Sequence, residues 1–185
     1  MSNWKRIGFM GVVLLSMQYF NANSQVFKTE KGQVEFVSEA PLNKFSGKSS
    51  VLKGLIDFDQ NLLDFYLDLN TLKTGIGLRD RHMRENYLET DKFPFAEFTG
   101  KLEPVPPLEE GKETAVNAIG KFKIHGIERD LRVTGSVLLK NNLLTLKTSF
   151  QVRLGDHDIE VPKIVFYELA EEQAVHIDAL FTKTQ

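Results

Sequence analysis

The chain lacks cysteine altogether and contains a single tryptophan among its 185 residues. Without cysteine no disulfide can form, so the fold must be held by its core, and no lipid can be attached through an N-terminal cysteine. The chain also lacks a large excess of either charge. Its 23 Lys and Arg residues nearly balance its 25 Asp and Glu residues, for a net charge of −2. A general nucleic-acid binder needs a basic surface, so we expect no nucleic acid as a partner.

Long hydrophobic runs are missing as well. Spanning a bilayer takes roughly 20 apolar residues, and the best candidate, residues 7–17, is shorter. It follows Lys5 and Arg6 and precedes the small residues Ala22 and Ser24. This order is typical of an export signal. We therefore expect residues 1–24 to be a cleavable signal peptide, with an uncleaved anchor or a buried helix as the alternatives, and residues 25–185 to form one periplasmic or secreted domain.

Most of the remaining chain alternates between apolar and polar residues. Strict alternation is typical of a strand with one buried and one solvent-facing side. Clear examples are residues 63–70, 144–153 and 175–182. Further strands are predicted at residues 32–39, 47–58, 95–103, 115–124 and 131–139. The sequence thus predicts an all-β domain of about eight strands.

The connections between these strands are short. Residues 59–61 and 140–142 contain Asn or Asp, which tolerate left-handed backbone conformations. Short connections imply antiparallel neighbours. Eight antiparallel strands fit either a closed barrel or a two-sheet sandwich, and the pattern does not choose between them.

One stretch breaks the alternation. Leu78, Met83 and Tyr87 recur at helical spacing within a charged segment, and Phe93 and Pro94 follow it. We expect one short helix over residues 78–87, since proline cannot continue a helix.

The same stretch carries a motif. Residues 79–98 read R-D-R-H-M-R, then Y-L, then K-F-P-F-A-E-F, and residues 120–131 read G-K-F-K-I-H-G-I-E-R-D-L. Both blocks closely resemble the YceI-like family, and the resemblance extends over residues 32–182. It implies an eight-stranded antiparallel lipocalin-like barrel with a helix near one end. Members are exported and hold a polyisoprenoid chain in an apolar lumen, and some are dimers.

The candidate ligand-binding residues come from the predicted inner faces of the strands. They are Phe65, Leu67, Leu69, Phe98, Phe122, Ile124, Phe150, Val152, Ile177 and Phe181. Two interpretations stay open for them: a packed core, which any β domain needs, or the wall of a ligand-filled lumen with a few polar groups at its mouth.

The charged run at the helix has three interpretations. Its side chains could form a solvated helix face, or Arg79 and Asp80 could be buried and lock the helix over the barrel. Alternatively, Arg79 and His82 could meet an anionic head group, because guanidinium groups bind phosphate well. The last interpretation adds Arg79 and His82 to the candidate ligand-binding residues.

Nothing in the sequence indicates catalysis, a metal or a cofactor. There is no G-x-S-x-G motif and no glycine-rich phosphate loop. Glu97 and Glu103 have the spacing of ordinary solvent-facing residues on one strand. The four histidines, His82, His125, His157 and His176, are scattered, so we expect them at the surface rather than in a metal site.

The hypothesis is an exported lipid-binding protein that holds an isoprenoid-type chain in its lumen for transport or storage. The expected partner is an apolar lipid such as a polyisoprenoid or quinone, and the resemblance allows a homodimer. The first alternative is a filled-core barrel that acts as a non-catalytic stress-response or protein-interaction module. The second is a lipid hydrolase or isomerase with a polar pair inside the cavity.

Overall fold

The computed structural model describes residues 25–161 and 169–184, and the predicted signal peptide lies outside these residues. Eight strands form a closed barrel in which each strand pairs with the next and β1 pairs with β8, always antiparallel. The strands are β1 (Val26–Ala40), β2 (Asn43–Asp57), β3 (Leu62–Asp68), β4 (Phe95–Leu102), β5 (Glu113–Ile124), β6 (Ile127–Lys140), β7 (Leu143–Arg153) and β8 (Glu172–Lys183). The all-β prediction is confirmed, and the architecture is a barrel rather than a sandwich.

The hairpin turns form where short polar residues accept left-handed conformations. Asn141 and Asn142, between β6 and β7, have φ values of 54° and 61°. His125 and Gly126 turn β5 into β6 with φ values of 52° and 76°. The second turn lies in the block of residues 120–131, whose resemblance implied a hairpin, and it makes β6 begin four residues earlier than the predicted strand. Tight turns of this kind fix the register of the strands that they join.

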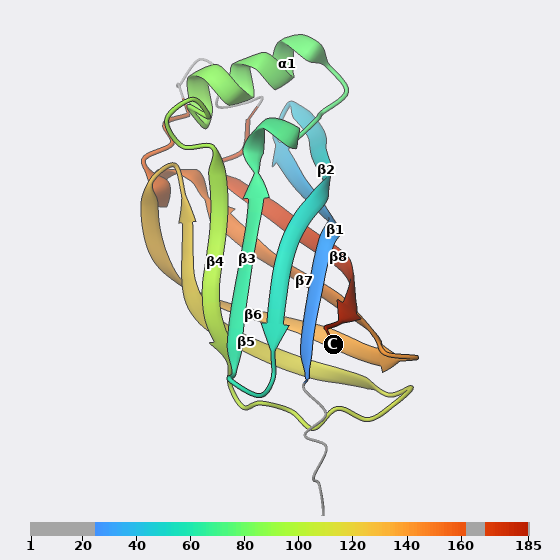
Figure 1. Cartoon of the computed structure of the whole chain (residues 1–185). Coiled ribbons are helices and arrows are strands. Elements are labelled where there is room, and N and C mark those ends of the chain that lie inside the picture. The colour runs from blue at the N-terminus through green and yellow to red at the C-terminus, as the bar shows by residue number, and fades with distance from the viewer. Residues whose placement is uncertain (1–24, 162–168, 185) are drawn as a thin grey trace, which may run out of the picture.

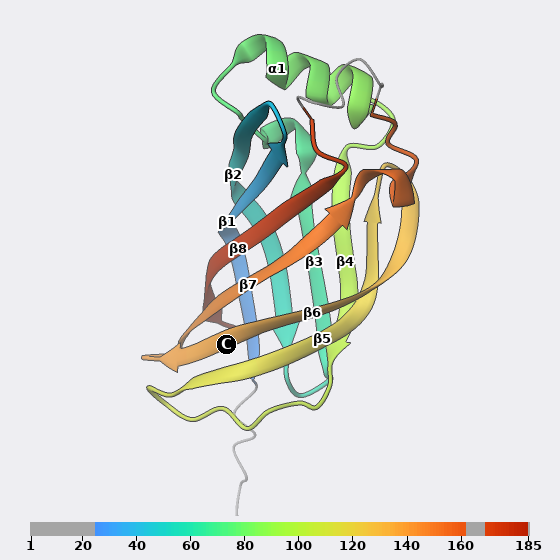
Figure 2. The same cartoon turned by 180° about the vertical axis from the view of Figure 1, so that it is seen from behind.

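The predicted helix is present, in two parts. α1 (Gly77–His82) continues directly into the wider π-helical turn η2 (Met83–Tyr87), and together they lie across one end of the barrel (Figures 1 and 2). Met83 is buried as expected, but Leu78 is 54% exposed. In the described part of the chain, no helix has the length and apolar character needed to cross a membrane.

Two apolar clusters occupy the two ends of the barrel. The cluster away from the helix includes Phe27, Ile56, Leu144 and Phe181, none of which is more than 3% exposed. The cluster beneath the helix includes residues of the short 3-10 helices η1 (Leu69–Thr71) and η3 (Leu154–His157), together with Met83. The first cluster consists almost entirely of strand residues, and the second also contains Met83 from the helix that covers this end.

Candidate functional site

The barrel encloses a cavity of about 520 Å³. Inward-facing side chains of all eight strands and of the helix line it, and most are aliphatic or aromatic. This volume lies within the range of about 300–1,000 Å³ that is usual for small-molecule sites. The alternation of apolar and polar residues along each strand produces this wall, because every second residue of a strand points into the barrel.

Eleven of the twelve candidate residues line this cavity. They are Phe65, Leu67, Leu69, Phe98, Phe122, Ile124, Phe150, Val152, Ile177, Arg79 and His82. Phe181 also points inward but lies in the packed cluster away from the helix, fully buried and 6.0 Å from the Phe65 ring, centroid to centroid. Alternation predicts the face of a strand, whereas the depth along the barrel decides between cavity wall and packed core.

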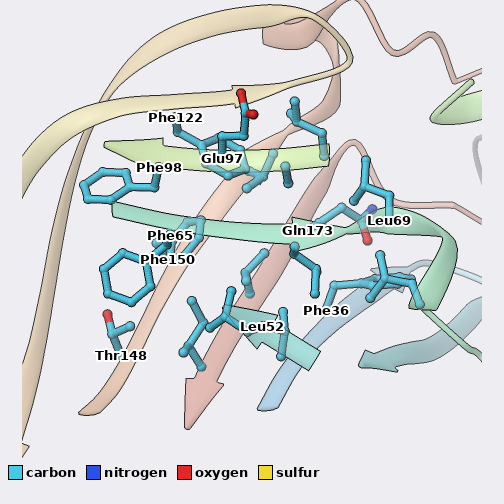
Figure 3. A pocket seen from close by; sticks show the side chains of 18 of the residues that line it. Phe36, Leu52, Phe65, Leu69, Glu97, Phe98, Phe122, Thr148, Phe150 and Gln173 are labelled. Atoms are coloured by element: carbon cyan, nitrogen blue, oxygen red, sulfur yellow. The ribbon is translucent and has the colours of Figure 1, made fainter. Parts of the chain in front are cut away.

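Aromatic rings shape the wall. Phe122 packs edge-on against Phe150 with ring centroids 5.8 Å apart, and Phe65 lies 6.5 Å from Phe98. Such pairs stabilise each other beyond their buried area. Figure 3 shows Phe98, Phe122 and Phe150 at one end of the pocket, and Phe36, Leu69 and Gln173 at the other.

A buried carboxylate ties the helix to the segment that leads into it. Asp80 is 7% exposed and accepts hydrogen bonds from both the backbone N–H and the hydroxyl of Thr74. Burial raises the Asp80 pKa, but these hydrogen bonds and the charges of Lys73 and Arg84 outweigh it, so the pKa lies below its ordinary value. Asp80 is thus buried, as the lock interpretation expects, but its partner is Thr74 in the segment before the helix rather than the end of a strand.

The mouth of the cavity lies between the helix and the hairpin that joins β1 to β2. Ile76 and Leu78 line the cavity and are 50% and 54% exposed, so the cavity reaches the surface beside them. The Arg79 guanidinium stands 4.2 Å from the centroid of the Phe45 ring, across the mouth. Arg79 thus contacts an aromatic face instead of forming the hydrogen bond to a strand end that the lock interpretation assigned to it.

Two of the histidines differ from the surface position that was expected. His157 is 4% exposed, and one of its ring nitrogens lies 3.0 Å from the Ile127 carbonyl oxygen. His125 lies between the His157 carbonyl oxygen and the Glu89 carboxylate, at 3.0 and 3.1 Å. Both join turns that are distant in sequence, which alternation could not reveal. Within residues 25–161 and 169–184, no cluster of three metal-ligating side chains occurs.

Glu97 on β4 and Glu103 just after it form ion pairs with neighbouring strands, and Glu97 is also among the residues around the cavity (Figure 3). Glu97 lies 3.1 Å from Lys123 on β5, and Glu103, just after β4, lies 3.4 Å from Arg132 on β6. These partners agree with the solvent-facing pattern read from the sequence.

Gln173 is a lining residue that sequence reasoning missed. It lies at the start of β8, two residues before the predicted strand, and is 7% exposed. The alternation of residues 175–182, extended backward by two, would have placed it on the inner face.

A family model described as the YceI-like domain matches residues 24–181. Among curated proteins none matches the chain. Solved structures are similar over most of the barrel. A polyisoprenoid binding domain from Saccharophagus degradans, implicated in plant cell wall breakdown, has a TM-score of 0.75 at 18% identity, covering 86% of this chain and 98% of that one.

Two further structures have the same fold. Burkholderia cenocepacia BcnA is 16% identical with a TM-score of 0.69, covering 82% of this chain and 96% of that one. A Campylobacter jejuni YceI protein is 14% identical with a TM-score of 0.60, covering 100% of this chain and 94% of that one. At these identities the likeness shows the fold alone.

Proposed function

The chain belongs to the YceI-like family, and from that premise we propose that it is an exported carrier that holds one isoprenoid-type chain in its lumen for transport or storage. The observation that carries the proposal is the cavity of about 520 Å³ with a predominantly apolar wall. A filled-core barrel would leave no such space. The similarity to a polyisoprenoid binding domain supports the same ligand class.

Burial of the lipid chain supplies the binding energy. Each methylene group removed from water contributes roughly 0.8 kcal/mol. A tail of about ten carbons therefore contributes roughly 8 kcal/mol, enough to offset much of the ordering cost of binding. The aromatic pairs along the wall, such as Phe122 with Phe150, are rigid surfaces for such a tail.

The mouth gives the route by which the lipid enters. Exposed apolar residues at its edge, Ile76 and Leu78, continue the apolar wall to the surface. Arg79 lies across it, in contact with Phe45. In this proposal the helix α1 and the turn η2 form a lid, and Arg79 and His82 of α1 are the lining residues that meet an entering head group.

The test is native mass spectrometry of the protein purified from its own periplasm or medium, followed by organic extraction. A bound species of several hundred daltons with an isoprenoid-type mass supports the carrier and identifies the lipid, including a quinone. A clean apo mass would instead favour the protein-interaction alternative. A variant with a filled lumen, Ala118→Phe, is the matched control, because Ala118 lines the cavity and the variant should be purified without lipid.

A further inference from the structure

Gln173 places a polar group in the apolar wall near the lid. Its side chain lines the cavity and is 93% buried, since 7% is exposed. Figure 3 shows Gln173 at the same end of the pocket as Leu69 and Phe36, opposite to Phe98 and Phe122. A polar amide in this position needs partners, because a buried polar group without a hydrogen bond is costly.

The amide nitrogen has its partners within the barrel. Nε2 of Gln173 donates to the backbone carbonyl of Ala170 at 2.6 Å and to the Ser38 hydroxyl at 3.3 Å. A carbonyl oxygen only accepts hydrogen bonds, so the nitrogen rather than the oxygen must face Ala170. The orientation of the amide is therefore determined, and Oε1 is directed away from these partners.

The amide oxygen of Gln173 has no hydrogen-bond donor in the described part of the chain. Oε1 of Gln173 is buried and has no hydrogen-bond partner among the described residues. Two other hydroxyl groups of the barrel are paired, in contrast to Oε1. The Thr148 hydroxyl donates to the Thr134 carbonyl at 2.7 Å, and the Ser49 hydroxyl lies 2.7 Å from that of Thr71. Oε1 is thus a buried acceptor, on a residue that lines the cavity, that lacks a donor within residues 25–161 and 169–184.

We propose that the ligand carries a hydrogen-bond donor at its head and that Gln173 accepts from it, which makes Gln173 a specificity-determining residue. The inference rests on the proposed function and narrows it. An alcohol, phenol or quinol supplies an O–H group to Oε1, whereas a quinone, an aldehyde or a hydrocarbon has no such donor. The head group then lies beneath the lid, and the tail extends toward Phe98 and Phe122.

The experiment compares two probes that differ in this donor. Farnesol has a terminal hydroxyl, and farnesal has the same number of heavy atoms but only accepts hydrogen bonds. Affinities of both are measured by calorimetry on the delipidated protein. We expect farnesol to bind about tenfold more tightly, the ratio to which ~1.4 kcal/mol corresponds, because farnesal leaves Oε1 unpaired.

Two variants assign the preference to this residue. Gln173→Met keeps the length of the side chain and removes the acceptor, so the preference for farnesol should disappear. Thr148→Val is the matched control, since it removes a lumen hydroxyl that already donates to Thr134, and it should keep the preference.

The outcomes separate the two proposals. Equal affinity of farnesol and farnesal for the unmodified protein would overturn this inference while leaving the carrier intact, even if Gln173→Met does not fold. An unchanged preference in folded Gln173→Met would also overturn it. If neither probe binds, the carrier proposal and this inference are both overturned.

Discussion

The carboxylate of Asp80 accepts hydrogen bonds from both the backbone N–H of Thr74, at 2.7 Å, and its hydroxyl, at 2.6 Å. The contact joins the first turn of α1 to the segment that leads into it. Asp80 is 93% buried, so this pair holds the start of the lid helix in a defined conformation. A carboxylate that accepts two short hydrogen bonds cannot be replaced without loss.

We therefore predict that Asp80→Asn lowers the free energy of unfolding by about 1–3 kcal/mol at neutral pH, because the charge-assisted hydrogen bonds are lost. Chemical denaturation measures this difference. Asp91→Asn is the control, since Asp91 is exposed nearby, and it should change the stability little. Equal stability of the Asp80 variant and the unmodified protein would contradict this account of the lock.

The same carboxylate predicts a dependence on pH. The folded-state pKa of Asp80 is lowered, while an unfolded Asp titrates near pH ~3.9. A depressed pKa stabilises the fold above the unfolded value, and the contribution is lost as pH falls through the folded value. The stability difference between the unmodified protein and Asp80→Asn should thus be constant above about pH 5 and shrink below about pH 4. A difference that grows on acidification would refute this sign.

Filling the lumen should abolish lipid binding without unfolding the barrel. Ala118 lines the cavity, while Ala115, on the same strand β5, is exposed on its outer face. We expect Ala118→Phe to be purified free of lipid and to take up no isoprenoid probe, and Ala115→Phe to bind as the unmodified protein does. Melting temperatures check that both variants fold. Full binding by a folded Ala118→Phe variant would argue against the lumen as the site.

Arg79 should slow the release of the lipid. Its contact with Phe45 across the mouth is a cation–π interaction, worth about 0.5–1 kcal/mol at an exposed site. Removing the charge in Arg79→Met should raise the dissociation rate of a fluorescent isoprenoid analogue about two- to fivefold. Arg81→Met, at an exposed position of the same helix, is the control. Identical release rates in the two variants would contradict a role of Arg79 at the mouth.

If the protein is exported with a cleaved signal peptide, its mature form should have one defined N-terminal residue. Cleavage after Ser24 would make Gln25 the first residue, and its nitrogen lies 2.9 Å from the Asp59 carboxylate. Intact mass and N-terminal sequencing of the protein from the periplasm or medium should therefore show Gln25 first. Leu14→Arg, which interrupts the apolar run, should leave an uncleaved precursor in the cell, whereas Leu42→Arg in an exposed hairpin should be processed normally. Recovery of the full-length chain from the exported fraction would contradict cleavage.

The strands and the short helix could be predicted because they depend on neighbours in sequence. Alternation places Ile177 on the inner face of β8, and the asparagines at 141 and 142 accept the left-handed turn conformations observed there. The spacing of Met83 and Tyr87 likewise predicts a helix. In each case the signal is a property of a few consecutive residues.

The tertiary structure decided how deep in the barrel each inward-facing side chain lies and which polar groups form hydrogen bonds with one another. Phe181 and Ile177 share one face of β8, yet Ile177 lines the cavity and Phe181 lies in the packed end. The choice depends on strand tilt and on register around the whole barrel, which a period of two does not contain. The partners of Gln173 and Asp80 were equally hidden, because hydrogen bonds between turns and strand ends form only once the barrel has closed. The sequence by itself determined which side chains face inward, and the closed barrel decided which of them meet a ligand.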